Sequence, residues 1–185
     1  MVRLTRSKPH KNVREVAVDC LSRRALTRYE LETRLKEKGF ENSEIHETLE
    51  RLEKLGYLND QELALTVSQN RLKRYSRRRV LQDLQNRGLA PQLIEQALGC
   101  NYSSDDEFQQ CLALAKQWWI REGKRWEQRI QAEKTKRSVP RELWLQQRVA
   151  QKLVQRGYLS DMVQNVLTQI QTIYNGEDEG DDSSV

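Results

Sequence analysis

The feature that most constrains the fold of this chain is a short pattern that occurs three times. A leucine stands four residues before a glycine, and two apolar residues follow that glycine at the sixth and tenth positions. The copies are Leu35, Gly39, Ile45 and Leu49; Leu84, Gly88, Ile94 and Leu98; and Leu153, Gly157, Val163 and Leu167. Another apolar residue precedes each glycine by eight positions, so one helical face runs into it. Such recurrence is typical of helical-repeat proteins.

Each copy predicts a helix, a stop at the glycine and a second helix. Glycine is favoured just past a helix C-terminus because the backbone there turns through a left-handed conformation that a Cβ disfavours. Residues suited to helix starts follow each glycine: Asn42 and Ser43, then Pro91, then Ser160. Two helices per copy are therefore expected.

A further helix is expected ahead of each pair, at roughly 13–25, 60–74 and from 104 onward. Residues 27–30 and 104–107 fit the capping box that opens a helix, Asn59 or Asp60 fits as a cap, and so does Ser76. The sequence thus predicts an all-α protein: three tandem three-helix repeats in an elongated, curved array.

The expected organisation is an N-terminal basic arm (1–12), three repeats (13–58, 59–100 and 104–174) and an acidic tail (175–185), with arm and tail disordered. The second and third repeat glycines are 69 residues apart, against 49 for the first and second. The extra residues fall near 119–141 and keep helical spacing at Trp126 and Ile130, which predicts a helical extension.

Composition favours a soluble, helical, basic protein. Charged residues make up 32% of the chain and its net charge is +5; without the five acidic residues of 177–182 it would be about +10. The three cysteines lack metal-ligand spacing and indicate a reducing compartment. The basic N-terminus has no apolar core and no apolar run is long enough to cross a membrane, so we expect a cytoplasmic protein.

No catalytic constellation is recognisable. His10 and His46 stand in polar surroundings, and the acidic residues fall at caps or on solvated faces without the grouping that holds a metal. Gly123 and Lys124 lack the upstream glycine of a phosphate-binding loop. We expect a protein that is not an enzyme and needs no cofactor.

The middle repeat contains a basic joint, which we define as residues 71–79. No acidic residue occurs from Leu63 through Gln82, and the candidate binding residues within that window are Arg71, Lys73, Arg74, Tyr75, Arg77, Arg78 and Arg79. A solvated charge run is the ordinary interpretation. If Ser76 is the cap, however, three arginines occupy the first helical turn, where each cation costs about 0.3–1 kcal/mol. Such a local conflict favours a site for phosphates or carboxylates of a partner.

Sequence-specific binding to a DNA duplex is not favoured. A helix-turn-helix protein reads the major groove with the last helix of its motif. The third helix of the first repeat carries an acidic stripe, Glu44, Glu47, Glu50 and Glu53, which duplex phosphates would repel.

At these residues the chain resembles the RecX family of bacterial recombination regulators over about 13–174. The stretches that carry the resemblance are 29–31 with 35–40, 56–60, 71–76 leading to Leu84 and 87–89, and 153–159. Two departures stand out. The family usually has a Gly-aromatic-Gly joint where this chain has Arg74, Tyr75 and Ser76, and the third repeat contains the Trp-rich insertion.

The resemblance implies a non-enzymatic modulator of RecA, mostly an inhibitor, that binds RecA filaments on single-stranded DNA. It also implies a role in recombination and repair, with single-stranded DNA contacted directly or through RecA. A monomer is expected because no long heptad seam is present.

Two alternatives remain open. One is a general nucleic-acid-binding protein that needs no RecA, and the other is a protein-docking scaffold that uses exposed Trp119, Trp126 and Trp144.

Overall fold

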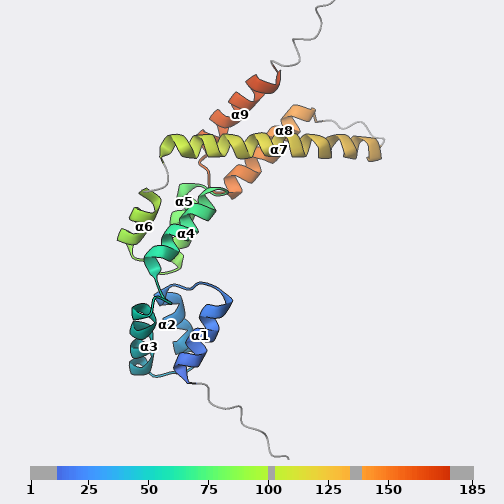
Figure 1. Cartoon of the computed structure of the whole chain (residues 1–185). Helices are drawn as coiled ribbons and strands as arrows, with labels where there is room; N and C mark the ends of the chain where they lie inside the picture. Colours follow the sequence, from blue (N-terminus) through green and yellow to red (C-terminus); the bar gives the residue numbers. More distant parts are fainter. Residues whose placement is uncertain (1–11, 100–102, 134–138, 176–185) are drawn as a thin grey trace, which may run out of the picture. The chain divides into compact units, whose positions relative to one another are not determined.

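A computed structural model describes residues 12–99, 103–133 and 139–175, and these residues are helical with no strand (Figure 1). The helices are α1 (Val13–Arg23), α2 (Arg28–Glu37), α3 (Asn42–Lys54), α4 (Asp60–Leu72), α5 (Arg77–Asn86), α6 (Pro91–Gly99), α7 (Ser104–Glu133), α8 (Arg141–Gln155) and α9 (Ser160–Asn175). The predicted all-α class with tandem three-helix repeats is confirmed.

The three repeat glycines have the expected left-handed backbone. Their φ angles are 83° at Gly39, 74° at Gly88 and 90° at Gly157. Each glycine N–H donates to the carbonyl three residues earlier at 2.9 Å, which closes the last helical turn. Gly56 (φ 74°) ends α3 in the same way. The repeated leucine-to-glycine spacing therefore marks a repeated helix stop.

Several predicted helix starts are confirmed. Thr27 and Glu30 form a complete capping box at α2. The side-chain oxygens of Asn59 and Ser76 each accept a hydrogen bond from the N–H three residues on, at 3.0 and 3.2 Å. Pro91 is the first residue of α6, where its missing N–H costs no helical hydrogen bond.

Two other predicted starts are wrong by one residue. The capping box of α7 joins Ser103 to Asp106 rather than beginning at 104: the Asp106 N–H donates to Ser103 Oγ at 3.1 Å, and the Ser103 N–H donates to the Asp106 carboxylate at 2.9 Å. Ser160, which was expected to cap α9, is instead its first helical residue, whereas α3 begins at Asn42 as predicted. Glu41 precedes α3 without a side-chain hydrogen bond, so the turn after Gly39 fixes that start.

The described residues divide into two compact units. The first contains the described residues up to Val67 together with Leu84–Ala97, and the second contains Ser68–Asp83 together with the described residues from Leu98 onward. Each of α4, α5 and α6 thus contributes residues to both units. The boundaries of the three repeats remain a prediction.

The core of the first unit is formed by the apolar faces of α1, α2 and α3. Leu31, Leu35, Ile45 and Leu49, all from the first copy of the repeat, are at most 2% exposed. Removing this much aliphatic surface from water is what holds the short helices together.

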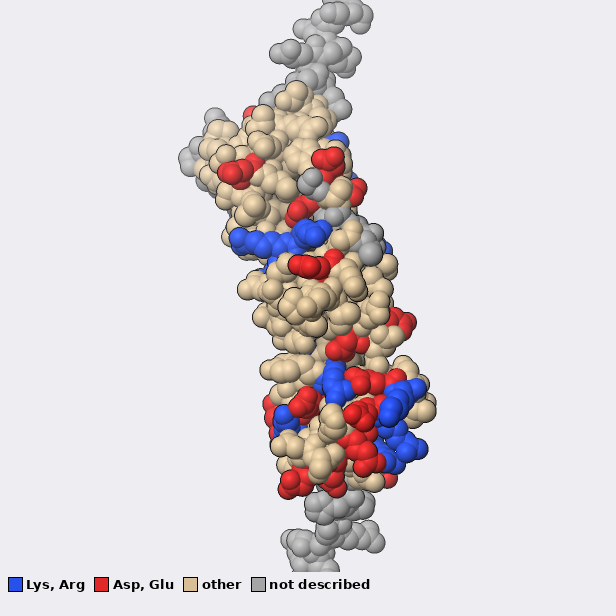
Figure 2. Space-filling view, turned by 90° about the vertical axis from the view of Figure 1, so that its left-hand side faces the viewer, with Lys and Arg blue, Asp and Glu red and all other residues tan. Residues whose placement is uncertain are grey.

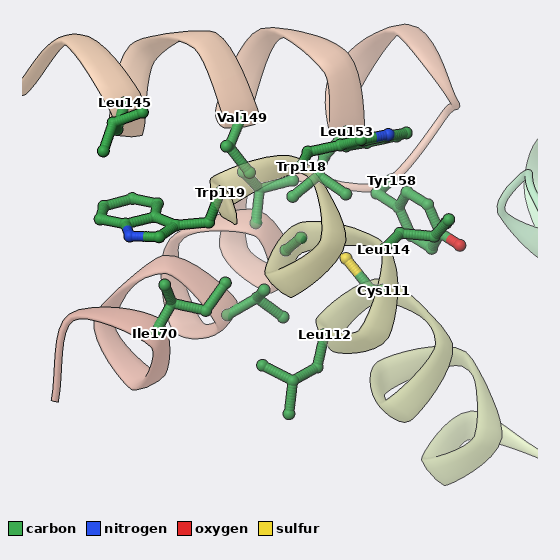
Figure 3. Packing of buried hydrophobic residues seen from close by; sticks show 13 residues of the cluster. Cys111, Leu112, Leu114, Trp118, Trp119, Leu145, Val149, Leu153, Tyr158 and Ile170 are labelled. Carbon is green, nitrogen blue, oxygen red and sulfur yellow. The ribbon is translucent and has the colours of Figure 1, made fainter. Parts of the chain in front are cut away.

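The second unit has a larger, aromatic core between α7, α8 and α9. Trp118 and Trp119 of α7 lie among Val149 and Leu153 of α8 and Ile170 of α9 (Figure 3). The predicted helical extension is confirmed as far as Glu133, because α7 is a continuous helix of 30 residues. Several predictions fall on residues that the structure does not describe: those for the arm through residue 11, Cys100, residues 134–138 and the tail from 176.

Candidate functional site

The basic joint connects α4 to α5 and lies within the second unit. The chain leaves α4 in a tight turn in which the N–H groups of Arg74 and Tyr75 both donate to the carbonyl of Arg71 at 2.9 Å. Ser76 then caps α5, and its side chain is 1% exposed. The predicted crowding is confirmed: three arginines form the first turn of α5, with no acidic residue among them.

Neighbouring helices of the same unit hold the backbone of the joint. The carbonyl of Arg156, at the end of α8, accepts the N–H of Ser76 at 3.0 Å, while its guanidinium donates to the carbonyl of Arg74 at 3.2 Å. Gln110 of α7 donates to the carbonyl of Lys73 at 2.6 Å. The joint is therefore a turn whose backbone is fixed by its contacts with α7 and α8.

Two guanidinium groups lie over the ring of Tyr75. The Cζ atoms of Arg71 and Arg156 are 4.9 and 4.8 Å from the centroid of its ring. Because cations are attracted to the face of an aromatic ring, this arrangement stabilises two like charges beside each other. Tyr75 is half-buried, so its ring serves this packing rather than standing open to stack on a base.

Three of the predicted binding cations are partly engaged inside the protein. Arg71 forms an ion pair with Asp83, and Arg79 Nε lies 3.7 Å from the other carboxylate oxygen. Arg77 is half-buried: its backbone N–H donates to a Glu107 carboxylate oxygen at 2.9 Å and its Nη1 donates to the carbonyl of Leu98 at 3.0 Å. Since Glu107 and the Ser76 hydroxyl occupy N–H groups of the first turn of α5, the cationic side chains are the parts left to meet an anion.

The remaining cations are exposed and uncompensated. Lys73, Arg74 and Arg78 are solvent-exposed, and within the described ranges none of the three forms an ion pair. In the space-filling view a band of basic side chains is visible, whereas basic and acidic side chains are intermixed over α1–α3 (Figure 2). The joint thus offers three cations to an acidic or polyanionic partner.

The acidic stripe of α3 is present as predicted, and part of it is paired. Glu47 accepts a hydrogen bond from Arg14 at 2.8 Å, and His46 and Arg28 lie against Glu50 and Glu53. The exposed face of α3 remains acidic and unsuited to a duplex groove.

The prediction of a docking surface made of exposed tryptophans is wrong for two of its three residues. Trp119 and Trp126 are each 5% exposed, because the inner face of α7 packs on α8 and α9. Trp144 is half-buried, with its ring centroid 5.1 Å from that of Trp126.

Sequence reasoning missed the residues that fix the joint. Asp83, Glu107 and Arg156 each engage it from outside residues 71–79. Among the described helices, none is long and apolar enough to cross a membrane.

Fold and site together define a tandem three-helix-repeat protein with a cationic joint in its middle repeat. Sequence models of the first and second three-helix domains of RecX match residues 14–52 and 59–98. A regulatory protein RecX of Trichlorobacter lovleyi is 30% identical over 81% of this chain and 90% of its own length. The chain belongs to the RecX family.

Two further comparisons define the extent of the likeness. A regulatory protein RecX of Deinococcus radiodurans is 32% identical over 62% of this chain, and the chain spans only 55% of that relative. The crystal structure of RecX from Lactobacillus salivarius superposes with a TM-score of 0.61, at 18% identity, over 86% of this chain and 94% of that one. That structure supports the fold alone.

Proposed function

We propose that this protein is a non-enzymatic regulator of RecA that binds RecA filaments on single-stranded DNA and restrains their recombinase and ATPase activity. It acts in the cytoplasm as a monomer. The regulatory role follows the name of its relatives, and the mode of contact follows from the joint.

The observation that carries the proposal is the set of three uncompensated cations, Lys73, Arg74 and Arg78, on a turn of fixed backbone. A flexible basic segment would lose conformational entropy on binding, whereas this turn is already ordered by its contacts with α7 and α8. The partner surface that fits is acidic or phosphate-bearing. A filament presents acidic groups and phosphates at regular intervals. Several modest contacts made by one chain can therefore add to a larger total binding free energy.

The structure also determines which variants test the proposal. Arg77 is unsuitable for charge reversal because Leu98 and Glu107 anchor it. The informative variant is Arg74→Glu combined with Arg78→Glu, since both side chains are exposed and unpaired within the described part. The matched control is Arg121→Glu with Lys124→Glu on α7, which changes the net charge equally at exposed positions outside the joint.

We expect the joint variant to need about a hundredfold more protein, or higher, for half-inhibition of RecA ATPase and strand exchange, because it loses two charge-assisted hydrogen bonds worth about 1.5–3 kcal/mol each. The control pair should inhibit like the wild type. Full inhibition by a joint variant with native helix content would remove the joint from the mechanism.

A general nucleic-acid-binding function is the second candidate, and the same uncompensated cations favour it. The two functions are separated by measuring binding to bare single-stranded DNA, to free RecA and to the assembled filament at several salt concentrations. A RecA regulator should prefer the filament. A general binder should bind the bare strand equally well, with affinity falling steeply as salt rises.

A further inference from the structure

A second basic feature follows the face of α8. Trp144, Arg148, Lys152 and Arg156 recur at intervals of four residues from within α8 to the residue that ends it, so their side chains project on one side of the helix. Twelve residues of helix separate the first from the last, a rise of about 18 Å. We call this set the α8 stripe.

Three of the four residues of the α8 stripe line a pocket between α7 and α8. The pocket has a volume of about 280 Å³ and is lined by Trp144, Arg148 and Lys152 from α8 and by Glu122, Arg125, Gln128 and Arg129 from α7. Four of these residues are cations and one is a carboxylate. Both helices belong to the second unit, and they pack on each other.

The single carboxylate is buried and orients two of the cations. The side chain of Glu122 is 5% exposed and accepts hydrogen bonds from Lys152 Nζ at 3.0 Å and from Arg125 Nη1 at 2.7 Å. Burial by itself would raise the pKa of Glu122, but the hydrogen bond and charge of Lys152, together with Arg125, outweigh it and lower the pKa. Glu122 is therefore ionised at neutral pH, and its two cationic partners, Lys152 and Arg125, together carry one positive charge more than it neutralises.

The cations of the stripe alternate with aromatic rings. The guanidinium of Arg148 lies over the ring of Trp144, 5.4 Å from its centroid, and Arg148 forms no ion pair in the part of the chain that is described. Lys152 Nζ lies 5.8 Å from the ring of Trp118. At the far end Arg156 contacts both Trp118 and Tyr75, the aromatic residue of the basic joint. The stripe thus leads from the pocket to the joint.

We propose that the pocket and the α8 stripe form a binding track for a single-stranded polynucleotide, a site separate from Lys73, Arg74 and Arg78. The pocket accepts a phosphate between Arg125 and Arg148, and the guanidinium plane of Arg148, backed by Trp144, supports a neighbouring base. Stacking of this kind needs bases whose faces are exposed, as in a single strand and unlike a duplex. The track rests on this unit alone and requires no RecA.

The test uses the full-length protein and a fluorescein-labelled oligothymidylate, with binding followed by anisotropy between 50 and about 200 mM salt. The key variants are Arg148→Gln and Arg125→Gln. Lys124→Gln is the matched control, because Lys124 is exposed on α7 beside Arg125 but does not line the pocket. Circular dichroism confirms that each variant retains its helix content.

We expect each pocket variant to reduce the slope of log affinity against log salt by about 0.7, the value for one lost phosphate contact on a single strand. Arg148→Gln should also lose base stacking and weaken binding between about fivefold and a hundredfold. Lys124→Gln should bind like the wild type. Binding should quench tryptophan fluorescence, and Trp144→Phe should remove most of that quenching, because the other three tryptophans are buried.

Three results would overturn the track. The first is wild-type affinity in both pocket variants, and the second is an equal loss in Lys124→Gln, which would indicate only general charge. The third is a pocket-dependent affinity for polyglutamate with none for the oligonucleotide, which would assign the site to acidic peptides. None of these assays contains RecA and none alters Arg74 or Arg78, so failure of the track leaves the proposed function intact.

Discussion

The cost of placing a Cβ at the repeat glycines can be measured by substituting alanine at equivalent positions. Gly39 and Gly157 both have left-handed backbones, with φ angles of 83° and 90°. Their surroundings differ. A Cβ at Gly39 would meet nothing within 4 Å, whereas a Cβ at Gly157 would lie 2.6 Å from Ser76 Oγ and 2.8 Å from Arg79 Cβ.

The expected magnitudes follow from these two environments. A left-handed backbone costs a residue with a Cβ about 1–2 kcal/mol, and alanine recovers about 0.4–1 kcal/mol by restricting the unfolded chain. Gly39→Ala should therefore lower the free energy of unfolding by about 1 kcal/mol. Gly157→Ala adds an overpacking cost of about 1–3 kcal/mol, for a total of about 2–4 kcal/mol. Ser76 cannot easily move aside because it is buried and caps α5.

Urea unfolding with two probes separates the effects. All four tryptophans lie in the second unit, so fluorescence reports that unit, while far-ultraviolet circular dichroism reports every helix. Gly157→Ala should move the fluorescence midpoint downward by about 1–2 M, taking a typical urea slope of about 2 kcal/mol per molar. Gly39→Ala should leave the fluorescence midpoint nearly unchanged. A fluorescence shift for Gly157→Ala no larger than that for Gly39→Ala would refute the steric argument.

Three further predictions concern buried polar groups. Glu122→Gln should lower the free energy of unfolding at pH 7 by about 3 kcal/mol, because it leaves Lys152 without its buried partner. The folded-state pKa of Glu122 lies below its ordinary value of 4.5. The difference in free energy of unfolding between the wild type and Glu122→Gln should therefore be complete above that pH and shrink as the pH falls further. Urea titrations at pH 7 and 3 would show this. Thr27→Ala removes a capping box and a buried hydrogen bond and should cost about 1–2 kcal/mol by circular dichroism, whereas Thr33→Ala, which loses one bond on an exposed helix face, should cost less than half of that. Burial raises the pKa of Cys111 to about 12, so its thiol should resist alkylation at pH 8 until urea unfolds the second unit; rapid labelling of the native protein, read by mass spectrometry, would contradict this.

The predictions that succeeded depend on interactions within a few residues. The left-handed glycines, the capping box at Thr27, the cap at Ser76 and the start of α6 at Pro91 each involve neighbours in sequence. The errors at α7 and α9 amount to one residue, which is within the range over which helix ends vary.

The sequence shows where positive charge gathers in the candidate site, but not which of those charges are paired inside the protein. A run of seven candidates showed where positive charge gathers, and the three arginines of the first turn of α5 were correctly placed. The partners that decide this are distant in sequence. Arg71 and Asp83 are 12 residues apart, Arg77 and Glu107 are 30 apart, and Arg156 and Arg74 are 82 apart. No local spacing rule connects such residues. From the sequence alone, the seven side chains are therefore equally good candidates for binding a partner.

The sequence by itself determined the helical class, the repeat and the concentration of positive charge at one joint, since periodicity, turn chemistry and net charge are properties of short segments. Tertiary structure alone decided which charges remain available. It buried Trp119 and Trp126, engaged Arg71 and Arg77, left Lys73, Arg74 and Arg78 exposed, and aligned α8 with α7 around Glu122. The physical reason is that the availability of a charge depends on which distant carboxylate, carbonyl or ring the packing of helices brings within a few ångströms.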